Sequence, residues 1–206
     1  MRITRLYTPS GDPEHVRAVL DHEEELKVDA DMVATFGLYV GMELDAETLD
    51  SLRAAVARRK TRNHALRLTG SRPMSRKELT DRLRRRGSTV EDAAEAADWM
   101  EHLGAVDDGE YARMIVRHYS EKGFGPAKVR SELYRRGIPK ELWEDALGEL
   151  PEEEETVERV LEARLSPHPD REELKKLMGL LQRRGFGYET IRAALERYIT
   201  DMGEYE

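Results

Sequence analysis

Arginine side chains recur at positions where they could bind phosphate groups. The triplet Arg-Arg-Gly occurs three times in the 206 residues, each time at the end of a stretch with helical periodicity. If the leucine four residues before each glycine points into a core, the residue two positions later lies about 200° round the helix and faces solvent. The arginines at this outward position are Arg85, Arg135 and Arg183.

Further basic residues widen this outward face on the predicted helices around the first two triplets. Rows of arginine and lysine suit phosphate backbones, which they bind through counterion release with little sequence preference. Few aromatic residues accompany them, so the pattern does not indicate a base-stacking platform. We predict that a nucleic-acid phosphate backbone is bound by Lys77, Arg82, Arg84, Arg85, Arg113, Arg117, Lys128, Arg130, Arg135 and Arg183.

Catalytic patterns are weak in this sequence. Asp107 and Asp108 are adjacent carboxylates, but adjacent residues at a helix start diverge by about 100°, so helix capping explains them better than metal binding. The segment Gly123-Phe-Gly125 follows no strand and has no lysine placed to hold a nucleotide phosphate. We therefore expect no catalytic residue, no metal, no cofactor and no enzymatic activity.

The elements that carry these residues repeat along the chain. Gly87, Gly137 and Gly185 are 50 and 48 positions apart, a spacing typical of helical repeat proteins. Six offsets from each glycine hold apolar or aromatic residues in all three copies, at eight and four positions before it and six, nine, ten and thirteen after it. This helical spacing predicts one buried face per helix.

The sequence predicts a mainly α fold. It has three tandem three-helix repeats over residues 46–103, 107–150 and 153–206, stacked into an elongated, curved body because each helix pair is too thin to bury its apolar face alone. Residues 1–45 are predicted as a small β-rich element, a hairpin with a third strand, followed by a short helix that Gly37 ends. Predicted helix caps are Asp29 or Asp31 for the short helix, then Asp45, Ser75, the pair Asp107 and Asp108, and Asp170.

Charge is distributed unevenly around the net value of −8. Residues 1–52 carry 4 basic and 12 acidic side chains, residues 53–140 carry 21 and 12, and residues 141–206 carry 9 and 18. A basic block between acidic ends points to a polyanionic or acidic partner for the middle of the chain. Cysteine is absent, and no signal peptide or membrane-spanning stretch is evident, so we expect a cytoplasmic monomer without membrane contact.

Several short motifs, in order over about residues 60–200, resemble the RecX family of regulators of the bacterial RecA recombinase. They are Ala65-Leu-Arg-Leu68 with Ser75-Arg-Lys-Glu-Leu79, Asp107-Asp-Gly-Glu-Tyr-Ala112, Gly123-Phe-Gly-Pro126 with Glu132-Leu-Tyr-Arg-Arg-Gly-Ile138, and Gln182-Arg-Arg-Gly-Phe186. The resemblance implies repeats that lie in the groove of the RecA filament on single-stranded DNA and suppress its ATPase, strand-exchange and coprotease activities. It also implies a role in homologous recombination, DNA repair and the SOS response, and DNA binding by the protein itself.

Three classes of function remain open at this point. The first is a non-enzymatic modulator of RecA, in which the basic middle of the chain meets DNA phosphates or acidic filament surfaces. The second is a free-standing DNA- or RNA-binding regulator, which predicts salt-sensitive binding to bare nucleic acid with no gain when RecA is added. The third is a helical-repeat scaffold for another protein, which predicts no nucleic-acid binding at low salt.

Overall fold

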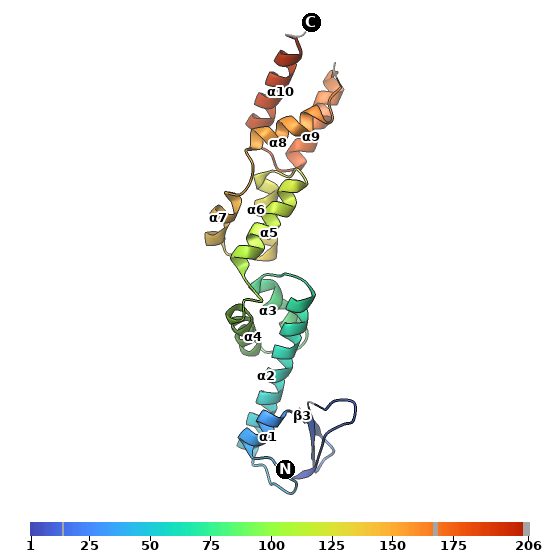
Figure 1. Cartoon of the computed structure of the whole chain (residues 1–206), viewed down its shortest axis with the longest axis vertical. Coiled ribbons are helices and arrows are strands. Elements are labelled where there is room, and N and C mark those ends of the chain that lie inside the picture. Colours follow the sequence, from blue (N-terminus) through green and yellow to red (C-terminus); the bar gives the residue numbers. More distant parts are fainter. Residues whose placement is uncertain (14, 167–168, 204–206) are drawn as a thin grey trace. The chain divides into compact units, whose positions relative to one another are not determined.

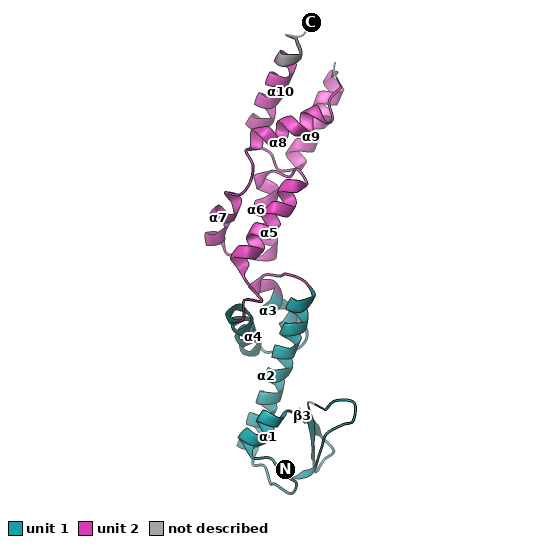
Figure 2. Cartoon of the chain, in the orientation of Figure 1, with its two compact units in different colours: residues 1–71, 79–102 teal, residues 72–78, 103–206 magenta. Residues whose placement is uncertain are grey.

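The computed structural model describes residues 1–13, 15–166 and 169–203. The chain divides into two compact units, residues 1–71 with 79–102 and residues 72–78 with 103–206 (Figure 2). In the described residues, one small sheet near the N-terminus precedes a long series of helices (Figure 1). The predicted mainly α fold with a small N-terminal β element is confirmed.

The N-terminal sheet has three antiparallel strands in the order β1-β2-β3: β1 is Ile3–Tyr7, β2 is Val16–Leu20 and β3 is Glu25–Val28. Leu6 pairs with Ala18, and Ala18 pairs with Leu26. One face of the sheet is buried because Ala18, Leu26 and the neighbouring apolar residues pack against Leu49 and Leu52 of the following helices. The predicted hairpin with a third strand is confirmed.

Helix α1, Ala30–Phe36, begins at Asp29, whose carboxylate accepts the Met32 N–H at 2.8 Å, and ends at Gly37 in the left-handed conformation. Helix α2, Ala46–Ser71, is capped by Asp45, whose carboxylate accepts the Thr48 N–H at 2.7 Å. The first part of α2 packs on β3 and its later part packs on α4. Both caps agree with the sequence, because short polar side chains satisfy the free N–H groups of a helix start.

In the described part of the chain, nine helical segments follow the repeat pattern. The first repeat contains α2, α3 (Arg76–Arg85) and α4 (Val90–His102). The second contains α5 (Asp108–Glu121), α6 (Pro126–Arg136) and a third segment made of the 3₁₀ turn η1 (Lys140–Leu142) and α7 (Trp143–Leu147). The third contains α8 (Glu153–Glu162), α9 (Arg171–Arg183) and α10 (Tyr188–Gly203).

The six repeated apolar positions form the cores of these repeats. Leu83, Leu133 and Leu181, four residues before each glycine, are all fully buried. The other repeated positions are buried as well, apart from three that are half-buried against the clusters around them: Trp143, Leu150 and Tyr198. The helical periodicity therefore identified the buried face of each repeat correctly.

The predicted helix starts are also confirmed. Ser75 and Glu78 form a reciprocal capping box, in which the Ser75 hydroxyl accepts the Glu78 N–H at 3.0 Å and the Glu78 carboxylate accepts the Ser75 N–H at 3.3 Å. Asp107 accepts the Glu110 N–H at 2.9 Å, and Asp170 accepts the Glu173 N–H at 2.7 Å. Asp107 is therefore a cap, as expected from its place at the start of α5.

The Arg-Arg-Gly turns join consecutive repeats as well as ending helices. The N–H groups of Gly125 and Ala127, at the start of α6, donate to the carbonyls of Arg184 and Gly185, just beyond α9, at 2.8 and 3.2 Å. In the same way the Ser75 hydroxyl, at the start of α3, donates to the Arg136 carbonyl at the end of α6 at 2.5 Å. At the first contact free N–H groups of a helix start meet free carbonyls beyond another helix end, and at the second a side-chain hydroxyl is the donor. We call these two contacts the repeat joints.

Each joint leaves no room for a side chain at its glycine. A Cβ atom on Gly185 would lie 2.4 Å from the Lys128 backbone nitrogen, and one on Gly137 would lie 2.1 Å from the Lys77 Cδ. A Cβ on Gly87 would meet nothing within 4 Å. All three glycines have a positive φ, which favours glycine at each position. Because Gly87 has open space around it, only Gly137 and Gly185 combine this backbone conformation with close packing.

We predict that Gly185→Ala destabilises the protein more than Gly87→Ala does. The left-handed backbone alone costs roughly 1–2 kcal/mol with a Cβ at either position. Gly185→Ala adds a clash with the Lys128 backbone, which costs roughly a further 1–3 kcal/mol. Urea unfolding of both variants measures the difference, with Gly87→Ala as the matched control. Equal losses in the two variants would show that the joint at Gly185 is not tightly packed.

Candidate nucleic-acid interface

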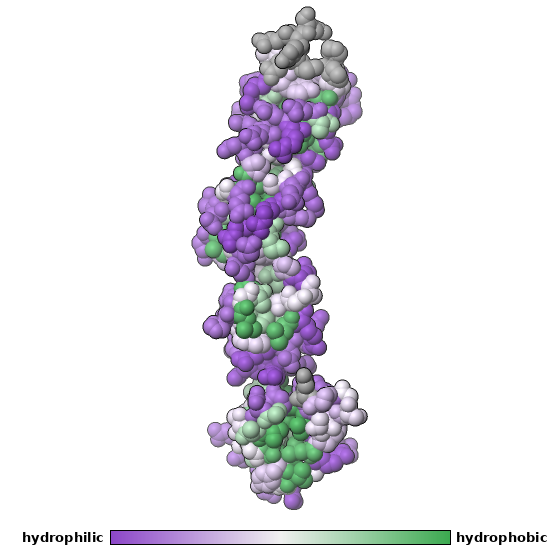
Figure 3. Space-filling model, in the orientation of Figure 1, coloured by the Kyte–Doolittle hydropathy of each residue, from purple (hydrophilic) through white to green (hydrophobic). Residues whose placement is uncertain are grey.

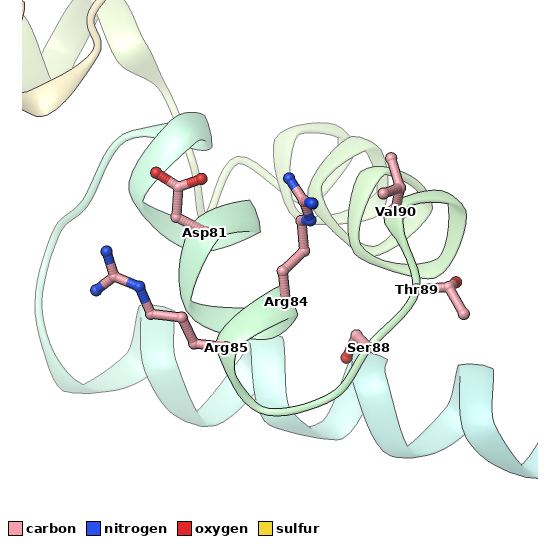
Figure 4. A pocket seen from close by; sticks show the side chains of 6 residues that line it. All are labelled: Asp81, Arg84, Arg85, Ser88, Thr89 and Val90. Carbon is pink, nitrogen blue, oxygen red and sulfur yellow. The ribbon is translucent and has the colours of Figure 1, made fainter.

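Arg84 and Arg85 lie at the C-terminal end of α3, beside the turn that leads into α4 (Figure 4). Both side chains are exposed, because Leu79 and Leu83 occupy the buried face of the same helix. Neither arginine forms an ion pair with any residue that the structure describes. They line an open hollow of about 520 Å³ whose lining residues are Asp81, Arg84, Arg85, Ser88, Thr89 and Val90.

Arg113 and Arg117 are predicted site residues whose charge is already offset within the second repeat. On α5, Arg117 binds Glu110 at 2.8 Å and Arg113 binds the other oxygen of the same carboxylate at 3.1 Å. Asp145 and Glu149 lie 3.4 Å from Arg113 and Arg117, respectively. Hydrogen bonds from Arg117 and Arg113 lower the pKa of Glu110 below its ordinary value. Three carboxylates therefore surround two guanidinium groups and leave little free positive charge.

Lys77 and Lys128 occupy the repeat joints. The Lys77 side chain covers Gly137, and the half-buried Lys128 lies against Gly185. The Lys77 stem and the Lys128 backbone therefore have a packing role that the sequence did not reveal. Arg82, on α3, is half-buried, in contrast to its exposed neighbours Arg84 and Arg85.

Arg85, Arg135 and Arg183 are all exposed, which confirms the direction predicted from helix geometry. Arg130 is exposed too, and it lies one turn before Tyr134, whose exposed fraction is 72%. Arg130 and Arg183 form no ion pair within the described ranges of the chain. These two arginines are therefore available to an external anion, whereas Arg135 has a partner within its own helix.

That partner is Glu132, a carboxylate with an exposed fraction of only 5%. It accepts hydrogen bonds from Arg135 at 2.5 and 3.0 Å and from Arg136 at 2.7 Å. The Arg136 guanidinium also donates to the Tyr111 hydroxyl and lies 5.5 Å from the centre of its ring. The hydrogen bonds from Arg135, followed by those from Arg136, lower the pKa of Glu132 to about 2 although burial raises it.

The second arginine of each triplet differs from its prediction. Helix geometry puts Arg86, Arg136 and Arg184 about 60° from the core direction, which predicts that their stems pack and their charged heads serve the helix ends. Arg86 is instead exposed, beyond the end of α3. Arg136 and Arg184 are half-buried as expected, but their heads lie near the aromatic rings of Tyr111 and Phe124. Helix geometry gives a direction only, and the neighbouring elements decide the partner.

Helix α2 carries a set of basic residues that the predicted interface omits. Between Asp50 and Glu78 the sequence contains no acidic residue, a signal that was available without a structure. The basic residues on α2 are Arg53, Arg58, Arg59, Lys60, Arg62 and Arg67. They belong to the first compact unit, together with Arg82, Arg84 and Arg85, whereas the other predicted site residues belong to the second.

Among the residues that the structure describes, no group of three or more His, Cys, Asp and Glu side chains is placed to hold a metal ion. None of the helices formed by these described residues is long and apolar enough to cross a membrane. Hydrophilic residues dominate the face of the second and third repeats shown in Figure 3. The chemistry on this face is therefore that of charged and polar surface groups.

We predict that Glu132→Gln destabilises the protein by roughly 2–3 kcal/mol at pH 7, because a charged acceptor is removed from two guanidinium groups in a buried place. The folded-state pKa of about 2 lies below the ordinary value of 4.5. The stabilisation is therefore complete above about pH 4.5 and is lost as the pH falls toward 2. Urea unfolding at pH 7 and pH 3 measures the effect, and the gap between wild type and variant should narrow at pH 3.

Glu121→Gln is the control for this prediction, since Glu121 is an exposed carboxylate near the end of α5. It should change the free energy of unfolding by less than about 0.5 kcal/mol at either pH. A Glu132→Gln variant as stable as this control at pH 7 would show that the Glu132 ion pairs contribute no net stability.

Comparisons with known proteins agree with this architecture. Residues 107–147 match the family model of the second three-helix domain of RecX, and residues 152–195 match that of the third. A solved structure of regulatory protein RecX superposes with a TM-score of 0.73 at 19% identity, covering 95% of this chain and 98% of that one. RecX from Lactobacillus salivarius superposes with a TM-score of 0.64 at 24% identity, over 71% of this chain and 99% of that one. These two likenesses show the fold.

Proteins related in sequence identify the family as well as the fold. Regulatory protein RecX of Bacillus subtilis is 30% identical over 210 aligned positions, which cover 99% of this chain and 78% of that protein. The protein of the same name from Chromohalobacter salexigens is 36% identical over 136 positions, covering 65% of this chain and 90% of that protein. With the repeat cores, the helix caps and the matched domains in agreement, this chain belongs to the RecX family.

Proposed function

We propose that this chain is a non-enzymatic regulator of the RecA recombinase that binds the RecA filament on single-stranded DNA. In this proposal it suppresses ATP hydrolysis, strand exchange and coprotease activity, and so acts in recombination, DNA repair and the SOS response. Membership of a family of regulatory proteins supports a regulatory role. The resemblance of the repeat motifs to RecX proteins is the reason for naming RecA as the partner.

The observation that best supports a direct contact with the filament is the pair Arg84 and Arg85. Both are exposed, have no ionic partner among the described residues, and lie beside an open hollow. Such unpaired guanidinium groups can bind phosphates or carboxylates without first breaking an internal ion pair. Arg130 and Arg183 share this property on the second and third repeats. Arg113 and Arg117 contribute less, because internal carboxylates offset their charge.

The protein acts as a cytoplasmic monomer without membrane contact, and its repeats are bounded at residues 46–103, 107–150 and 153–206 after an N-terminal element of residues 1–45. Lys77, Arg82, Lys128 and Arg135 are also kept as proposed contact residues. A free-standing DNA- or RNA-binding regulator is the second candidate, because unpaired arginines would bind bare nucleic acid equally well.

We predict that the double variant Arg84→Glu/Arg85→Glu loses most of the suppression of RecA ATP hydrolysis on single-stranded DNA. Charge reversal turns an attractive contact into a repulsive one, so the concentration for half-maximal suppression should rise about tenfold or more. The measurement is a steady-state ATPase assay, with circular dichroism to confirm the fold. Suppression at the wild-type concentration would rule out this hollow as the contact.

Arg164→Glu/Arg171→Glu is a matched control, because it makes the same charge change at two exposed arginines of the acidic third repeat. It should suppress RecA nearly as well as the wild type. If both double variants lose suppression equally, net charge and not the hollow is responsible.

Binding of the wild type to single-stranded DNA, with and without RecA and ATP, separates the classes of function. We expect binding to increase when the filament is present, since the filament offers protein contacts in addition to phosphates. Tight, salt-sensitive binding to bare DNA with no gain from RecA would favour the free-standing regulator. A failure to bind DNA or filament at low salt would favour a scaffold for another protein.

A further inference from the structure

A basic groove lies between α2 and the N-terminal sheet, within the first compact unit. It has a volume of about 570 Å³, comparable to the hollow beside Arg84 and Arg85 but formed by different residues. His15 and Lys27 line it from the sheet, since His15 directly precedes β2 and Lys27 belongs to β3. The residues of α2 that line it are Val56, Arg59, Lys60, Asn63, His64, Leu66 and Arg67. We call it the α2 groove.

Lys60 and Arg67 carry the unbalanced charge of this groove. Lys27 lies 2.7 Å from Asp12, and Arg59 lies 3.4 Å from Asp29, so these two cations have carboxylate partners. Lys60 and Arg67 form no ion pair with a residue in the described part of the chain. The lining itself contains no carboxylate, so the net charge of the groove is positive.

His64, on the wall of the groove, responds to this positive potential. Its pKa is lowered below the ordinary value, first by burial and then by the charges of Arg67, Arg86 and Lys60. Like charges close to an imidazole disfavour its protonated form. An anion bound in the groove would relieve this repulsion, whereas a cation would increase it.

The spacing along α2 suits a chain of phosphates. Lys60, His64 and Arg67 recur at intervals of four and three residues, so they lie on one face of the helix. Seven residues of helix span about 10 Å, so Lys60 and Arg67 are far enough apart to contact two different phosphates of one strand. Leu66, with an exposed fraction of 45%, provides apolar surface next to the charges.

An acidic protein segment fits this groove less well than a nucleic-acid strand does. Protein interfaces depend on buried apolar or aromatic anchors that fill pockets. The apolar part of the lining consists of Val56 and Leu66, and the groove has no aromatic residue. A row of cations with little apolar surface is typical of contacts to a phosphate backbone.

We propose that the α2 groove binds the phosphodiester backbone of a single-stranded nucleic acid, with Lys60 and Arg67 as its phosphate contacts. The inference rests on the proposed function for the kind of polyanion involved, and it adds a contact on α2 that the predicted interface omits. The N-terminal sheet thereby has a function of its own, because it supplies one wall of the groove. The groove is separate from the Arg84 and Arg85 hollow, so the two can be tested independently.

The test compares Lys60→Ala/Arg67→Ala with Arg53→Ala/Arg58→Ala in binding a fluorescein-labelled oligothymidylate of about thirty nucleotides, without RecA. The control pair makes the same charge change on the same helix, but Arg53 pairs with Glu24 and Arg58 with Asp92, outside the groove. Each lost phosphate contact reduces the slope of log Kd against log salt by about 0.7. The groove variant should therefore lose about 1.4 from this slope and bind about tenfold more weakly at low salt.

Several outcomes would overturn the inference. The first is a groove variant with the affinity and salt slope of the wild type. The second is an equal loss of oligonucleotide affinity in the control variant. The third is a wild-type protein that does not bind the oligonucleotide at low salt. Labelled poly-L-glutamate is the second probe. If the groove substitutions abolish binding of poly-L-glutamate but leave oligonucleotide binding intact, the groove binds an acidic protein. Lys60→Gln/Arg67→Gln keeps part of each side-chain stem and replaces the alanine pair if that pair fails to fold.

Failure of the α2 groove inference can be told apart from failure of the proposed function. The oligonucleotide assay contains no RecA, whereas the Arg84→Glu/Arg85→Glu experiment measures suppression of RecA. A groove variant with normal DNA binding, in a protein that still suppresses RecA, would overturn the groove alone. Normal groove-dependent DNA binding by a protein that never affects RecA would overturn the proposed function alone.

Discussion

Helix ends that satisfy one another are the constraint on which the repeat region depends. The start of a helix has unpaired N–H groups and its end has unpaired carbonyls. In the second unit, the α6 start donates through Gly125 and Ala127 to the carbonyls beyond α9, and the α3 start donates through Ser75 to the end of α6. The Lys128 backbone lies close to Gly185 and the Lys77 side chain lies close to Gly137, so neither glycine has room for a Cβ.

Thin repeat cores have a second consequence, which is a surface rich in charge. Each repeat buries one apolar face per helix, so most other positions are exposed and polar. Many of these charges are balanced internally, as in the cluster of Arg113 and Arg117 with Glu110 and in the buried pairs of Glu132. Function is expected where the balance fails, because an unpaired cation can bind an external anion without first losing a partner.

Such unbalanced positions occur on two helices of the first repeat, α2 and α3. Arg84 and Arg85 lie at the end of α3, and Lys60 and Arg67 lie along α2 beside the sheet. The N-terminal element is consequently more than an appendage, since β3 both buries Leu49 and Leu52 of α2 and completes the groove. Under the proposed function, several weak contacts would act together, because linked sites multiply their effect.

Local patterns in the sequence determined the fold class, the helix caps, the buried positions and the outward direction of Arg85, Arg135 and Arg183. These features depend on spacing within one helix or turn, which periodicity and side-chain chemistry describe well. Only the tertiary structure decided which cations are paired, that the Arg-Arg-Gly turns join repeats, and that α2 forms a groove with the sheet. The physical reason is that these properties depend on distances between residues far apart in the chain, which no local pattern contains.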